Sequence, residues 1–128
     1  GGGLGYVDEY STDGQFGARV ETGGRKNSPP NAPWGLAMAP ATGFGVFSGD
    51  LLIGNFGNGR IAAYEDRGGG KWVYKGELRH GDGTLVTIDG LWGLEFGNGA
   101  AAGPATTLYL TAGPGGEKHG LFGSITAA

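Results

Sequence analysis

Oxygen-bearing side chains that could bind a metal ion stand near the ends of predicted strands. The candidates are Asp50, Asn55, Asp89 and Glu95, with Asn31 as a further amide. Carboxylate and amide oxygens are ligands that Ca²⁺ accepts, so calcium is the one cofactor to consider. The sequence has no EF-hand loop and no Asp-x-Asp-x-Asp run. We therefore favour the alternative, in which Asp50 and Asp89 brace turns and Glu95 faces solvent or a channel.

Other chemistry-bearing residues do not form a recognisable catalytic pattern. His80 and His119 each flank a glycine turn, where a loop-bracing role is expected. No serine stands in Gly-x-Ser-x-Gly, and the absence of cysteine excludes a thiolate nucleophile, a thiolate zinc site and a disulfide. The glycine-rich run 97–102 loosely fits a dinucleotide loop, but it lacks the following helix and the downstream acid. No catalytic residue is predicted.

Two aromatic residues on one predicted outer strand leave two interpretations open. Trp72 and Tyr74 alternate with Val73 and Lys75. Such aromatics fit an exposed surface that contacts a glycan or a protein, and they fit equally well into packing between sheets.

Composition and charge exclude several classes of protein. The formal net charge is −3, and the nine lysines and arginines are scattered, so the basic patch of a nucleic-acid-binding protein is absent. No apolar run approaches the roughly 18 residues of a membrane-spanning helix. The chain begins at Gly1 without a methionine or a signal segment, from which we expect a processed product, a fragment or part of a longer reading.

The residues that position these groups form short strands, with no helical stretch of convincing length. Nine strands are predicted, and their ranges are 5–10, 15–21, 34–39, 50–54, 60–64, 71–78, 90–96, 107–111 and 121–125. Leu51, Leu52 and Ile53 are apolar without alternation, which predicts a strand covered on both faces. Phe44, Val46 and Phe47 are expected to tuck under the sheet.

Asn-Gly turns occur twice in identical tetrapeptides. Phe56-Gly57-Asn58-Gly59 precedes one predicted strand, and the same four residue types at 96–99 follow another. Their different places in the chain favour turn formation over a shared ligand site. The first is predicted to be a two-residue type I′ hairpin, which requires positive φ at Asn58 and Gly59.

A repeat organises the chain. Trp34-Gly35-Leu36 returns as Trp92-Gly93-Leu94, 58 positions later, each time at the start of a group of strands. Short strands that recur at such a spacing are typical of propeller blades. The predicted architecture is all-β, with antiparallel sheets of two, four and three strands. In it, the glycines allow close approach of backbones, and the tryptophans fill the wedge between sheets.

The motifs resemble those of a known kind of repeat. Pro-Trp-Gly-Leu-Ala at 33–37, Asp-Leu-Leu-Ile-Gly-Asn at 50–55 and the Gly-Arg-Ile-x-x-Tyr strand ending at Tyr64 resemble NHL-type β-propeller repeats. Together with Ile-Asp-Gly-Leu-Trp-Gly-Leu and the closing His-Gly-Leu-Phe-Gly-Ser-Ile, residues 33–125 are similar to the C-terminal part of an uncharacterised family of secreted bacterial propellers, some with PEP-CTERM sorting tails. The chain is too short for a closed ring.

The resemblance implies both organisation and role. Residues 1–30 would end a preceding blade and form a linker, residues 31–80 a complete blade, and residues 81–128 an incomplete final one. The implied role is non-enzymatic binding or structure, outside the cytoplasm (extracellular or periplasmic). Partners would be the remaining propeller, other chains or further copies, reached through open sheet edges. The alternative is a lactonase-like metal-dependent hydrolase with acids at the mouth of the channel.

Overall fold

The computed structural model describes residues 4–23 and 28–128, and the regular secondary structure of these residues is almost entirely β-strand. The predicted lead-in at residues 1–3 and the middle of the predicted linker, residues 24–27, lie outside the described residues. Nine strands form antiparallel sheets of two, four and three strands, which confirms the predicted grouping. None of the helices in the described residues is long and apolar enough to cross a membrane.

Each sheet runs in chain order from one edge to the other. The first pairs β1 (Tyr6–Tyr10) with β2 (Phe16–Thr22). The remaining strands make two sheets, in the orders β3-β4-β5-β6 and β7-β8-β9; their bounds are β3 Pro33–Met38, β4 Leu51–Asn55, β5 Ile61–Asp66, β6 Trp72–Glu77, β7 Leu91–Phe96, β8 Leu108–Ala112 and β9 Leu121–Ile125. Two short helical turns complete the fold, η1 at Gly45–Phe47 and α1 at Pro114–Glu117.

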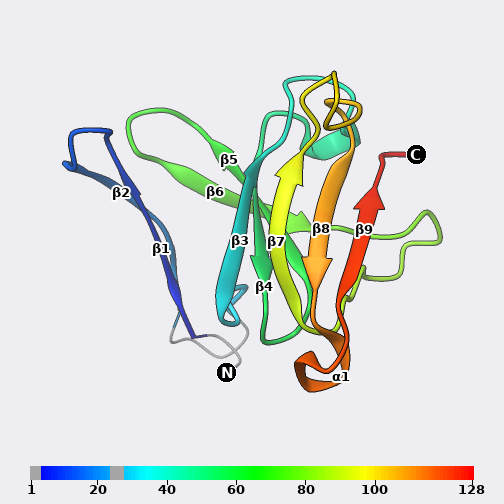
Figure 1. The fold of residues 1–128 in the computed structure, drawn as a ribbon. Coiled ribbons are helices and arrows are strands. Elements are labelled where there is room, and N and C mark those ends of the chain that lie inside the picture. Colours follow the sequence, from blue (N-terminus) through cyan, green and yellow to red (C-terminus); the bar gives the residue numbers. More distant parts are fainter. Residues whose placement is uncertain (1–3, 24–27) are drawn as a thin grey trace.

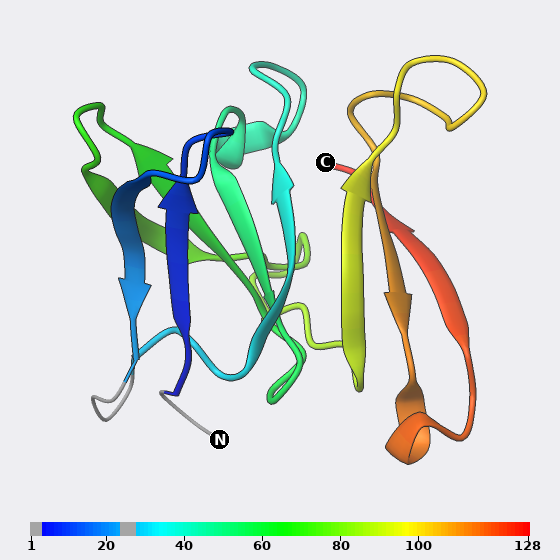
Figure 2. The same ribbon diagram turned by 60° about the vertical axis from the view of Figure 1, so that its left-hand side comes forward.

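The four-stranded sheet lies between the other two, as Figures 1 and 2 show. Its apolar residues alternate between two cores. Leu52, Ile61 and Ala63 belong to the core shared with β7 and β8, whereas Ile53, Ala62 and Tyr64 belong to the core shared with β1 and β2. The prediction that β4 is covered on both faces is therefore confirmed. Packing on two faces explains why this strand is apolar without alternation.

The loop between β3 and β4 packs only in part as predicted. Phe44 is buried against Phe96, with ring centroids 4.9 Å apart, and Phe47 is half-buried beside the same core. Val46 is exposed, so the prediction was wrong for this residue. It lies in the middle of η1, a single tight turn that directs neighbouring side chains to different sides.

The turn between β4 and β5 also differs from the prediction. Asn55 N–H donates to the Arg60 carbonyl, so the loop comprises the four residues 56–59 rather than two. Gly59 has φ +69°, whereas Asn58 does not have a positive φ, so a type I′ turn was wrong. Asn58 instead accepts the Arg60 N–H through its side-chain oxygen at 3.1 Å. Asn98 accepts the N–H groups of Ala100 and Ala102 in the same manner. A turn-forming role for both tetrapeptides is thus confirmed.

Candidate functional site

The predicted oxygen ligands lie apart. Asp50 and Asn55 stand at opposite ends of β4, and Asp89 and Glu95 at opposite ends of β7. Within residues 4–23 and 28–128, no group of three or more His, Cys, Asp or Glu side chains is placed to hold a metal ion. Each candidate has its own local surroundings.

Asp50 makes a buried ion pair. Its carboxylate is buried, and its Oδ2 lies 2.7 Å from Nζ of Lys75 on β6. The same ammonium donates to the Val46 carbonyl at 3.0 Å. Removing one partner of a buried pair leaves a desolvated charge, so this contact holds the β3–β4 loop against the outer strand. Asp50 acts here as a brace.

The other candidates serve turns or solvent. Asp89 Oδ2 accepts the Gly115 N–H at 2.9 Å and so ties the start of β7 to α1. Glu95 is exposed on β7. Asn55 Oδ1 accepts the Asn31 N–H at 2.8 Å. Two amides at one turn fall far short of the six to eight oxygens that Ca²⁺ takes.

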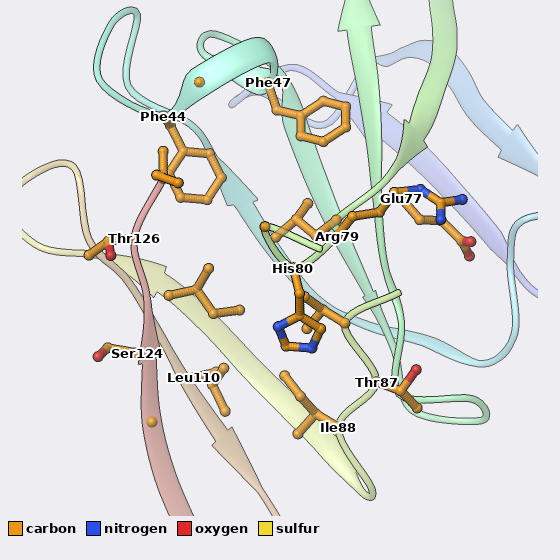
Figure 3. Close-up of a pocket in the computed structure, with 18 of the residues that line it drawn as sticks. Phe44, Phe47, Glu77, Arg79, His80, Thr87, Ile88, Leu110, Ser124 and Thr126 are labelled. Carbon is orange, nitrogen blue, oxygen red and sulfur yellow. The ribbon is translucent and has the colours of Figure 1, made fainter. Parts of the chain in front are cut away.

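The two histidines occupy different surroundings. His80 lies in the loop after β6 and borders the groove shown in Figure 3. His119 follows α1, is exposed and does not border that groove. The structure therefore does not unite them in one site.

Trp72 and Tyr74 contact neighbouring sheets and strands. Trp72 Nε1 donates to Glu9 on β1 at 3.0 Å. The Tyr74 ring lies 5.6 Å from that of Tyr64, and about two fifths of Tyr74 stays exposed. Tyr64 in turn donates its hydroxyl to Glu21 on β2 at 2.7 Å. Burial, and then the bond to Glu21, raise the pKa of Tyr64 far above its usual range.

The second and third sheets repeat one another register for register. Leu36 lies opposite Ile53 and Met38 opposite Leu51; correspondingly, Leu94 lies opposite Leu110 and Phe96 opposite Leu108. The next pair of strands repeats as well, because Leu51 lies opposite Tyr64 and Leu108 opposite Ile125. Strands β7, β8 and β9 thus correspond to β3, β4 and β5.

The first sheet corresponds to the outer half of the second. Glu9 lies opposite Ala18 and Tyr10 opposite Phe16, with Gly17 skipped at a bulge. On the second sheet Ala63 lies opposite Gly76 and Tyr64 opposite Tyr74, with Lys75 skipped. The aromatic pairs at the two bulges have the same 5.6 Å centroid separation. Strands β1 and β2 are therefore the counterparts of β5 and β6.

The same correspondence reveals an uncovered apolar surface. We call three residues of β3 the β3 face: Leu36 and Met38, on the side of β3 away from β7, and Trp34 at the start of the strand, whose ring also touches Trp92. All three are exposed, with Leu36 at 49%. On β7 the matching Leu94 is only 6% exposed, because β3 and β4 cover it. The prediction that both tryptophans fill a wedge holds only in part for Trp34, which touches the Trp92 ring but stays 60% exposed. The matching cover for the β3 face is missing from the described residues.

Close approach of β3 and β7 depends on glycines. A methyl group at Gly35 would lie 2.5 Å from the Trp92 carbonyl oxygen and 3.0 Å from the Leu94 nitrogen. At Gly54 it would lie 3.0 Å from the Leu94 side chain. The rings of Trp34 and Trp92 meet edge to face with centroids 4.4 Å apart. The predicted close approach of backbones is confirmed at Gly35. It was wrong at Gly93, where a methyl group would meet only the Thr111 side chain.

A groove of about 1100 Å³ separates β6 from β9. Figure 3 shows β8 and β9 along one side, and Phe47, Arg79 and His80 on the other. Its apolar lining includes Phe44, Phe47, Leu78, Val86, Leu110 and Ile125. The sheets are therefore in close contact at β3 and β7 and separate toward β6 and β9.

Sequence reasoning missed the polar contacts between the first two sheets, made by Glu9 and Glu21. Nothing in their local sequence distinguishes them from solvent-facing acids. A pattern that was available is aromatic-x-small-x-aliphatic, which occurs as Phe16-Gly17-Ala18-Arg19-Val20 and as Tyr74-Lys75-Gly76-Glu77-Leu78. It marks the outer strand that contains the bulge in both sheets.

The chain is similar in part to uncharacterised proteins of one virus. It is 38% identical over 111 residues to an uncharacterised protein of Acanthamoeba polyphaga mimivirus, covering 87% of this chain and 19% of the viral one. A second uncharacterised protein of that virus is 37% identical over 73% of this chain, and a third is 36% identical over 72%. No family model matches, and no solved structure matches. The chain spans about a fifth of the length of the curated relatives it matches.

Proposed function

We propose that this chain is a segment of a larger β-propeller of NHL-like type, with a non-enzymatic binding or structural role outside the cytoplasm. The observation that carries the propeller is the repeat of strand register across three stacked sheets. Units that share one register and pack through one face are what a blade array requires. The location outside the cytoplasm rests on the resemblance of the motifs alone.

The exposed β3 face supports the proposal that this segment lacks a neighbouring sheet. Three large apolar side chains in a row on one strand are a poor surface for water. On β7, the matching Leu94 is covered by β3 at Gly35 and by β4 at Gly54. The proposed cover of the β3 face is therefore the inner strand pair of a preceding blade. The short share of the viral relatives that this chain spans agrees with such a neighbour.

The strand inventory favours the rest of the propeller over further copies of this chain. Strands β1 and β9 both correspond to β5, the third strand of the complete sheet. A second copy joined end to end would supply the third strand twice and leave a surplus strand. A longer polypeptide that supplies the two inner strands before β1 meets the need without surplus.

Sedimentation and denaturant unfolding of the chain alone test this proposal. We expect either association through the β3 face or a broad, weakly cooperative transition, because one apolar face lacks its cover. Leu36→Asp should shift associated material toward the 12.9 kDa monomer. Val46→Asp, on an exposed turn, is the matched control and should leave the distribution unchanged. A sharp monomer with a single cooperative transition contradicts the proposal.

A further inference from the structure

The groove between β6 and β9 has the position that an outer strand occupies in the other sheets. In the complete sheet, β6 pairs with the outer edge of β5. The matching edge of β9 carries no strand in the described residues. In the first two sheets, the outer strands β2 and β6 also contact one another. A strand added to β9 would correspondingly lie over β6, whose residues 74–77 line the groove.

The two existing outer strands specify what such a strand must carry. The rings of Phe16 and Tyr74 each lie 5.6 Å from the aromatic ring of the preceding strand. Two residues later, across a bulge, come Ala18 and Gly76. The aliphatic residue two positions further on is Val20 or Leu78, and both are buried. Gly76 has φ +143°, a backbone conformation that favours glycine. Ala18 has no positive φ, so what the two bulges share at this position is a small side chain.

Resting on the proposed propeller, we propose that the groove binds a fourth strand from the rest of the longer protein, antiparallel to β9, with the pattern aromatic-x-small-x-aliphatic. The aromatic residue lies opposite Ile125, and the small residue lies opposite Ser124, as Tyr74 and Gly76 lie opposite Tyr64 and Ala63. Ile125 and Leu110 provide the apolar surface on one side, and Phe47 and Leu78 provide it on the other. The added strand continues the ladder that β8 and β9 begin.

Grafting the chain's own outer strand tests this assignment. Residues 126–128 are replaced by a copy of residues 65–78, which preserves the spacing from third to fourth strand found in the complete sheet. Tethering gives the copy a high effective concentration at the groove. We expect the β9 amides to gain at least tenfold protection from hydrogen exchange, with a higher melting temperature. The control graft has the same composition, but the tyrosine and glycine copied from Tyr74 and Gly76 exchange places.

Two variants locate the graft on the chain. Ile125→Asp lies on the groove side of β9 and should abolish the protection gained by the graft. Phe122→Asp lies on the opposite side, where Phe122 is 73% exposed, and should leave the gain intact. If Ile125→Asp fails to fold, the proposal is still tested by comparing the graft that keeps the copied residue order with the control graft. Equal protection from both grafts, or none from either, overturns the proposal.

Failure of the graft is distinguishable from failure of the propeller itself. The propeller proposal is tested by the self-association and cooperativity that depend on the β3 face. One informative result is that Leu36→Asp reduces self-association while the graft with the copied residue order gives β9 no protection. That result supports the propeller proposal and contradicts the fourth-strand proposal.

Discussion

Strands β3 and β7 contain the same Trp-Gly-Leu sequence in the same register, yet their exposure to solvent differs. Leu94 packs onto Gly35 and Gly54, whereas the matching Leu36 faces solvent. Neither sequence nor local geometry separates them; only a neighbouring sheet does. The comparison teaches that the motif alone does not bury its leucine: on β7 the cover is supplied by β3 and β4 of the neighbouring sheet.

Leu94→Ala should produce the largest difference between the two strands. Truncating this buried leucine removes apolar contacts and leaves a cavity, at a cost of about 3 kcal/mol of unfolding free energy. Leu36→Ala should cost less than about 1 kcal/mol in the isolated chain, because that side chain is half exposed. Denaturant titration measures both. If the two costs are equal in the isolated chain, the β3 face is already covered and the comparison fails.

The two glycines of the Trp-Gly-Leu motif should show the next largest difference in their effect on stability. Gly35→Ala forces a methyl group against the Trp92 backbone, which cannot move as a flexible side chain would, and should cost about 2 kcal/mol. Gly93→Ala meets only Thr111 Oγ1 at 3.1 Å and should cost less than about 1 kcal/mol. Thermal melts of the two variants provide the measurement. A melting temperature for Gly35→Ala at or above that of Gly93→Ala would show that β3 and β7 do not approach as described.

The interface of the first two sheets should respond to alkaline pH more than the interface of the last two. Tyr64 is held neutral by burial and donates to Glu21, so its pKa is raised in the folded state. Its contribution to stability is complete below the ordinary tyrosine pKa of 10.0 and is lost as pH rises above it. Tyr64→Phe should cost about 1 kcal/mol at neutral pH. It should also flatten the alkaline loss of stability. Equal alkaline slopes in the two proteins would be the contrary result.

Added calcium should have the smallest effect on stability. Asp50 is engaged by Lys75 and Asp89 by Gly115, so neither carboxylate is free to gather ligands. We expect the melting temperature in millimolar Ca²⁺ to match that in EDTA. A specific ion would raise it in proportion to the logarithm of concentration. A rise that Asp89→Asn removes would favour the metal-dependent alternative.

Repetition explains how much of the fold the sequence predicted. The Trp-Gly-Leu repeat and the apolar run at residues 51–53 predict the grouping of strands and the two-sided burial of β4, because both depend on local pattern. The exposure of Trp34 could not be predicted, since it depends on which segments pack against β3, and no local pattern encodes that. The ion pair of Asp50 with Lys75 joins residues 25 positions apart, and no local signal announces it.

The bulge shared by β1–β2 and β5–β6 has a consequence for the outer edge of each of these sheets. A bulge strengthens the twist of the edge strand and interrupts its ladder of free backbone groups. Together with Lys75 and Glu77 on β6, it makes that edge a poor template for an unrelated strand. Each unit would therefore resist sideways aggregation at its rim while remaining open to the neighbours that stack on its faces.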